Sequence, residues 1–116
     1  MTVYISPNPG KPQAYSIALR AAQILLTHDA QVLMQDTLQN DCSAMGVQYL
    51  PLEDCLQQTD VILTIGGDGT ILHEANRSLK YHKPILGINL GRCGFLATCE
   101  IDEMETKLSA VARGDF

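Results

Sequence analysis

The sequence feature that most limits the possible folds is a turn of three glycines and one aspartate. This turn follows the most apolar segment of the chain. The segment Val61–Ile65 is an unbroken, largely β-branched run, which is typical of a parallel strand buried on both faces. Residues 66–70 (Gly-Gly-Asp-Gly-Thr) end that run, and a helical pattern begins at Gly69 or Thr70. This order indicates an α/β architecture, in which ligands bind beyond the carboxyl ends of the strands.

The other elements are predicted from hydrophobic spacing and turn residues. Residues 36–58 predict only short helical turns and loops, with no defined boundaries. The expected strands are residues 2–6, 31–35, 61–65 and 84–90. The first expected helix runs from Pro12 to about His28. The second begins at residue 69 or 70; its apolar face carries Ile71, Leu72, Ala75 and Leu79, and His73, Glu74, Arg77 and Lys80 lie off that face. The third follows a capping Asp102, with Glu103, Met104, Leu108 and Val111 in helical order.

Alternating strands and helices predict the fold class: an open, mostly parallel sheet with helices on both faces, as in Rossmann-like domains. The 116 residues suit a single α/β nucleotide-binding domain spanning 1–116. The chain ends in a turn-like Gly-Asp-Phe, from which we expect it to be a piece of a longer protein.

Composition argues against several other classes of protein. The net charge is −5 and Lys and Arg form no stripe, which disfavours nucleic-acid binding. Cys42, Cys55, Cys93 and Cys99 lack the spacing of zinc ligands, so we expect no metal-binding residues and reduced, mostly buried thiols. No secretory signal or membrane-length apolar segment is present, so we expect a cytoplasmic protein without a membrane partner.

The glycine turn is suited to phosphate chemistry. Glycines let phosphates approach the backbone N–H groups, and the following helix N-terminus adds unpaired donors and partial positive charge. Thr70 can offer its hydroxyl to a phosphate or to the helix end. Asp68 is unexpected beside phosphates, because like charges repel. It either accepts a proton from an attacking hydroxyl, helps to hold Mg²⁺, or only caps the helix.

A second motif extends this interpretation to a family. Residues 87–96 (Gly-Ile-Asn-Leu-Gly-Arg-Cys-Gly-Phe-Leu) follow the glycine turn by about twenty residues. The two motifs in this order closely resemble the NAD kinase family, and Asn8, Pro9 and residues 104–116 resemble it more loosely. The resemblance implies an α/β N-terminal domain and a β-rich C-terminal domain that is absent from this chain, with the active site between them.

The resemblance also implies an activity. NAD kinases phosphorylate the 2′-hydroxyl of the adenosine ribose of NAD, using ATP or polyphosphate with Mg²⁺, and yield NADP. On this basis Asp68 is the general base. The implied binding residues are Gly66, Gly67 and Thr70 in the phosphate-binding turn, Asp68, Gly69, Leu72 and His73 against NAD, and Phe95 on an adenine. Asn89 either holds the second turn or reaches the ligand, and His73 is equally consistent with an ordinary solvated side chain.

Departures from the family pattern and competing interpretations remain. Cys93 replaces an apolar residue, and the family's downstream Asn-Glu pair has no counterpart, so the isolated chain is expected to be inactive. The alternatives are a lipid kinase of the diacylglycerol or sphingosine type, which shares the glycine motif, and a nucleotide-binding module without catalysis. Small-molecule nucleotides are the expected partners, together with homo-oligomer formation in the full-length protein.

Overall fold

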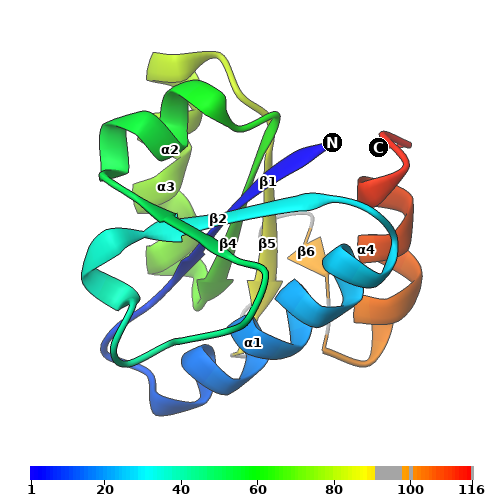
Figure 1. Cartoon of the computed structure of the whole chain (residues 1–116). Coiled ribbons are helices and arrows are strands. Elements are labelled where there is room, and N and C mark those ends of the chain that lie inside the picture. The colour runs from blue at the N-terminus through cyan, green and yellow to red at the C-terminus, as the bar shows by residue number, and fades with distance from the viewer. Residues whose placement is uncertain (91–97, 100, 116) are drawn as a thin grey trace.

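A computed structural model places six strands in one sheet with the order β3-β2-β1-β4-β5-β6 (Figure 1). The structure describes residues 1–90, 98–99 and 101–115. For residues 68, 98, 99 and 101 it describes the main chain only. The strands are β1 (Thr2–Pro7), β2 (Gln31–Gln35), β3 (Gln48–Leu50), β4 (Val61–Gly66), β5 (Ile85–Asn89) and β6 (Thr98–Cys99). Every described pairing is parallel, which confirms the predicted fold class.

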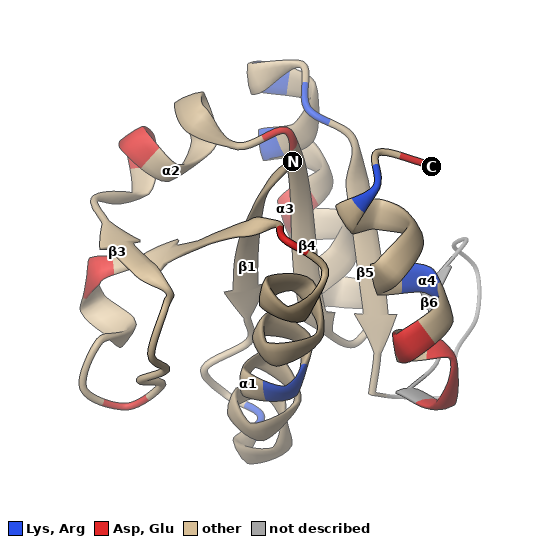
Figure 2. Ribbon diagram, turned by 45° about the vertical axis from the view of Figure 1, so that its right-hand side comes forward, with Lys and Arg blue, Asp and Glu red and all other residues tan. Residues whose placement is uncertain are grey.

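The helices cover the sheet on both faces. On one face, α1 (Pro12–Thr27) and α4 (Met104–Ala112) pack together over a core that includes Val3, Ile5 and Leu63. On the other face, α2 (Leu52–Gln58) and α3 (Asp68–Tyr81) cover a smaller cluster around Tyr4 and Ile62. In Figure 2, α1 and α4 lie on the near side of the sheet and α3 lies behind it. Because β4 has buried residues throughout, it reads as a continuous apolar run rather than an alternating one.

Most predicted elements are confirmed within one or two residues. The exceptions are short or irregular elements. The three-residue β3 and the two-residue β6 were not predicted, because neither is long enough to produce a hydrophobic period. Met104, Leu108 and Val111 are buried as expected, but the predicted cap is wrong: Asp102 lies in a short 3-10 turn and Glu103 precedes α4.

The predicted apolar face of α3 is wrong in part: Ile71 is buried as expected, but two of its leucines are not. Leu72 is 58% exposed and Leu79 76%, whereas Glu74, expected off the apolar face, is only 3% exposed. The physical reason is that the sheet beneath α3 offers a hydroxyl, Ser6, to the Glu74 carboxylate. A hydrogen-bonded, charge-paired carboxylate can be buried where an unpaired one cannot.

Two buried thiols lead to a prediction about reactivity. Cys42 and Cys55 are free and buried, as expected for reduced thiols. Burial raises the pKa of Cys42, and burial raises the pKa of Cys55 to about 11. Thiol reagents attack the thiolate, so both residues should resist labelling at pH 8 in the folded chain. Cys55 should begin to react only as the pH rises toward 11.

Labelling with iodoacetamide, followed by peptide mass mapping, measures the modification of each of these two thiols separately. Labelling in denaturant serves as the control, because it must modify both peptides. Rapid modification of Cys55 in the native chain at pH 8 would contradict its burial.

The surface carries dispersed charge. Lys and Arg are distributed over several elements rather than gathered on one face (Figure 2). Among the described residues, no helix has the length and apolarity needed to cross a lipid bilayer.

Candidate functional site

The candidate site lies where β1 and β4 end side by side. From there the chain enters α1 on one face of the sheet and α3 on the other, which is the arrangement that opens a ligand crevice in doubly wound sheets. The loop after β1 is tied to β4, since the Asn8 backbone N–H donates to the Ile65 carbonyl at 2.9 Å. The Asn8 side chain also donates to the Thr70 hydroxyl at 3.0 Å. Two segments some sixty residues apart in sequence therefore form one edge.

The glycine turn connects β4 to α3 with tight packing at one position and open space at two others. A Cβ at Gly66 would lie 2.7 Å from Oγ1 and 2.8 Å from Cβ of Thr70. At Gly67 and Gly69 a Cβ would meet no described atom within 4 Å. Gly66 thus permits the packing of the turn, whereas Gly67 and Gly69 leave their backbone accessible to a ligand.

Asp68 is the first residue of α3, and Gly67 holds the capping position without a side-chain cap. The main chain thus assigns the N-cap position to Gly67, and the alternative in which the Asp68 side chain caps the helix stays a prediction. The Asp68 side chain lies outside the described part of the structure, so its catalytic role stays a prediction. The main chain places it at the positive end of a 14-residue helix, a position that favours a carboxylate.

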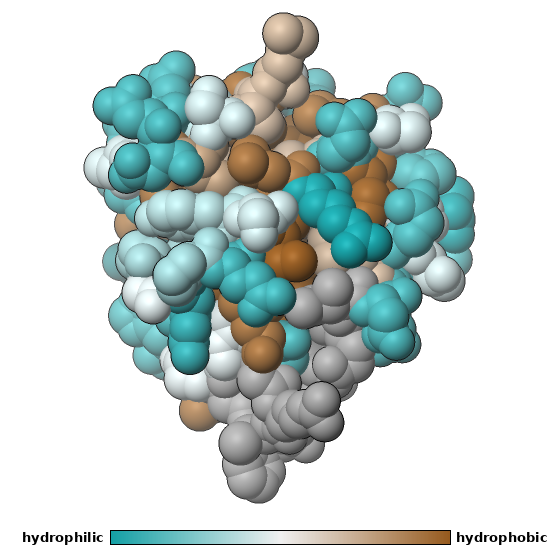
Figure 3. All heavy atoms as spheres, turned by 90° about the horizontal axis from the view of Figure 1, so that it is seen from below, coloured by the Kyte–Doolittle hydropathy of each residue, from teal (hydrophilic) through white to brown (hydrophobic). Residues whose placement is uncertain are grey.

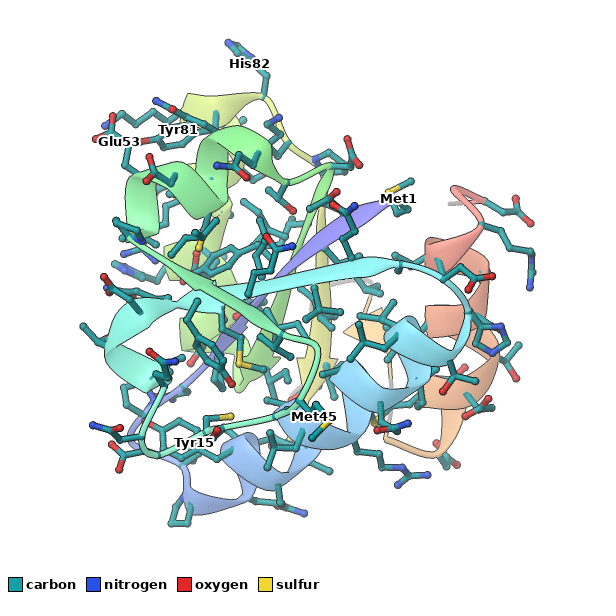
Figure 4. All side chains as sticks on the ribbon, viewed as in Figure 1. Met1, Tyr15, Met45, Glu53, Tyr81 and His82 are labelled. Atoms are coloured by element: carbon teal, nitrogen blue, oxygen red, sulfur yellow. The ribbon has the colours of Figure 1, made fainter. Side chains whose placement is uncertain are left out.

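A cavity of about 590 Å³ opens beside this edge. Its walls come from the ends of β1 and β2, from α1, from the segment after β2 and from the first turns of α3. Figure 4 places Tyr15, one of the lining residues, at the lower end of the molecule, opposite His82. Viewed from below, apolar surface lies between hydrophilic side chains (Figure 3). The lining residues are Tyr4, Ser6, Pro7, Asn8, Pro9, Tyr15, Gln35, Thr37, Leu38, Asp41, Gly69, Thr70, His73, Glu74 and Arg77.

One wall of the cavity is a polar cluster between β1 and α3, formed by Tyr4, Ser6, Glu74 and Arg77. Oε1 of Glu74 accepts from the Ser6 hydroxyl at 2.8 Å and from Nη1 of Arg77 at 2.9 Å. Burial raises the pKa of Tyr4 to about 12, although its hydrogen bond with Ser6 works against that shift. The phenol is therefore neutral near pH 7, and the charges in this cluster belong to Glu74 and Arg77.

Gly66 and Gly67 form the turn after β4, and the other predicted site residues fall into three groups. Gly69, Thr70 and His73 line the cavity. Leu72 does not line it and is exposed, and Asn89 is 3% exposed at the end of β5, where it pairs in register with Gly66. Phe95 and Cys93 lie outside the described residues, as does the side chain of Asp68.

Sequence reasoning missed Ser6, Glu74 and Arg77. For the two helix residues a signal was present, because positions 73, 74 and 77 follow helical spacing from Thr70 and share a face with it. Glu74 and Arg77 were placed only off the apolar face of the helix, and His73 was equally consistent with a solvated side chain. Ser6, at the end of the first strand, carried no signal beyond its position.

The arrangement can bind phosphates between backbone N–H groups, the Thr70 hydroxyl and the start of α3. No cluster of three or more His, Cys, Asp or Glu side chains suited to a metal ion occurs in the described part of the chain. Mg²⁺ is usually held by one or two carboxylates and by substrate phosphates, so the site is compatible with a metal that arrives with a nucleotide.

The strand order defines an α/β domain of the doubly wound class, with the glycine turn at the edge where such domains bind ligands. A family model described as the ATP-NAD kinase N-terminal domain matches residues 3–116. The chain therefore belongs to the NAD kinase family.

Individual relatives agree with this assignment. An NAD kinase from Heliobacterium modesticaldum is 35% identical over 115 residues, covering 99% of this chain and 40% of the relative. One from Methanopyrus kandleri is 36% identical over 107 residues, covering 90% and 36%. The crystal structure of yeast NADH kinase complexed with NADH shares the fold, with a TM-score of 0.81, 23% identity, and coverage of 99% of this chain and 38% of that one. The chain thus spans about two fifths of the length of these relatives.

Proposed function

We propose that the chain supplies the phosphate-binding half of an enzyme that transfers a phosphoryl group from ATP to the 2′-hydroxyl of the adenosine ribose of NAD, forming NADP. The observation that carries this proposal is the match of the family model to residues 3–116, with the family's glycine turn at the edge where β1 and β4 meet. The named relatives support the same activity.

The proposed chemistry needs one base and a set of positioned donors. Asp68 takes the proton of the ribose hydroxyl, the hydroxyl oxygen attacks the terminal phosphorus, and the bond from that phosphorus to the leaving ADP oxygen breaks. Gly66, Gly67 and Thr70 hold the transferred phosphate at the start of α3, and Gly69 lies against NAD. Mg²⁺ bound by the donor's phosphates neutralises part of their charge.

The remaining predicted roles complete the proposal. His73, Leu72 and Phe95 contact NAD, while Asn89 supports the second turn. The buried, free Cys42 and Cys55 are consistent with a cytoplasmic enzyme. A homo-oligomeric full-length protein is proposed, and light scattering measures its mass.

The test is an assay of the natural full-length protein with NAD, ATP and Mg²⁺, with NADP measured by an NADP-specific dehydrogenase. We expect turnover on NAD and none on sphingosine or diacylglycerol. Phosphorylation of the lipids alone would overturn the proposal in favour of a lipid kinase. Tight nucleotide binding without turnover on any acceptor would indicate a binding module.

The 116-residue chain by itself is expected to form no NADP at enzymatic rates. Its span of about two fifths of the relatives is the reason, because an active site built between two domains needs both. Assaying the chain beside the full-length protein at equal concentration checks this. Comparable turnover by the two would contradict it and would place the complete active site within residues 1–116.

A further inference from the structure

One face of α3 lines the cavity over two helical turns. Gly69 and Thr70 lie at its start, His73 and Glu74 come one turn later, and Arg77 comes two turns later. Arg77 lies seven positions after Thr70 in the α-helix, which is an axial distance of about 10 Å. A ligand that begins at the glycine turn and continues into the cavity must therefore lie along this face, and an elongated ligand can reach both ends.

Positive charge is found at both ends of this face. The N-terminus of α3 supplies partial positive charge at the glycine turn. Among the described residues that line the cavity, Arg77 is the one Lys or Arg. Glu74 and Asp41 are the acids, and the Glu74 carboxylate already contacts Arg77. At its two ends, this face therefore offers groups that can bind anionic parts of a ligand.

The Arg77 guanidinium is held in place by a buried acid. The Glu74 side chain is 4% exposed and joins Arg77 to Ser6 of β1 through one oxygen, Oε1. Its other oxygen, Oε2, is buried and has no hydrogen-bond partner in the described part of the chain. A half-satisfied buried carboxylate is a poor device for stability alone. It does orient the guanidinium of Arg77, whose side chain is 30% exposed and whose guanidinium carries N–H donors beyond the one that contacts Glu74.

We propose that Arg77 binds the polyphosphate chain of the phosphoryl donor, behind the phosphate held at the glycine turn, and that Glu74 positions Arg77 through its bond to Ser6. The inference rests on the proposed function, which requires such a donor, and adds the site that holds it. A guanidinium in fixed orientation matches phosphate oxygens in geometry and charge. ATP and inorganic polyphosphate share this chemistry, so either can supply the bound chain.

The experiment uses steady-state kinetics of the full-length protein, with NAD and the donor varied separately. Arg77→Ala should raise the KM for ATP, or for polyphosphate if that is the donor, by roughly 10- to 100-fold. The KM for NAD should stay within about twofold of the wild-type value. Arg77→Lys should recover part of the loss, because it restores charge without the planar donors. Glu74→Gln should raise the donor KM by less than Arg77→Ala does.

Controls separate this inference from folding and from the proposed function. Arg20→Ala, on exposed α1 surface, should leave both KM values unchanged, and thermal melts verify folding of each variant. Calorimetry with inorganic tripolyphosphate gives a second readout, in which Arg77→Ala should weaken binding and Arg77→Lys should weaken it less. An unchanged donor KM, or a rise confined to NAD, overturns the role of Arg77 and leaves the kinase assignment standing. If no acceptor is phosphorylated, the proposed function fails, and tripolyphosphate binding still decides whether Arg77 contacts the chain.

Discussion

Asp68→Asn in the full-length protein is expected to lower kcat for NADP formation by about 10²- to 10⁴-fold. The amide keeps the size and polarity of the side chain but cannot accept a proton at neutral pH. Because Asp68 lies at the start of α3, beside the turn proposed to hold the transferred phosphate, this loss should fall on the chemical step. The measurement is kcat from initial rates at saturating NAD and ATP.

Two comparisons make that result interpretable. Asp54→Asn, on the exposed surface of α2, makes the same chemical change away from the site and should leave kcat unaltered. The KM values of Asp68→Asn should change far less than kcat. A rise in the KM for NAD with kcat intact would assign Asp68 to binding and remove it as the base.

Gly66→Ala is expected to destabilise the chain by about 1–3 kcal/mol and to remove nucleotide binding. The new Cβ would lie within 2.8 Å of Thr70 Cβ, an atom fixed to the backbone of α3, so rotation of the Thr70 side chain cannot relieve the clash. The start of α3 must move instead, which breaks the bond from Asn8 to Thr70. Urea unfolding measures the stability, and calorimetry with ATP measures the binding.

Gly67→Ala and Gly69→Ala are the matched controls, because a Cβ at either position meets no described atom of the chain within 4 Å. Both should melt near the wild-type temperature. If phosphates approach this backbone closely, both should still bind ATP more weakly. A Gly66→Ala protein as stable as these two would show that the turn relaxes without cost.

The fold could be predicted from sequence wherever a segment had a long, regular pattern. The buried run of β4 and the helical spacing of α1 each have one dominant period, and both elements lie where they were expected. β3 and β6 depend on pairing with neighbours already in the sheet, which no local pattern encodes. Asp102 was misplaced as a cap because a short 3-10 turn intervenes before α4.

Some residues of the candidate site could likewise be predicted from the sequence, and others could not. The glycine turn was predicted because glycines and an acid after a buried strand are a local signal. Glu74 was not, because its burial depends on a hydroxyl sixty-eight residues earlier in the chain. A polar residue on a helix is usually solvated, and only the partner across the interface reverses that expectation. Arg77 was missed because its ion pair is with that buried acid, whose burial no local pattern indicates.

The central place of β1 has a consequence for biosynthesis. β1 leaves the ribosome before β2 and β4, the strands that flank it on both sides in the sheet, and its pairing with β4 joins residues almost sixty positions apart, such as Val3 and Val61. The nascent chain must keep this apolar strand unpaired along one edge until roughly residue 66 has emerged, and exposed strand edges of this kind invite association with other chains. Removing the first seven residues would divide the sheet into two separate halves instead of shortening one margin.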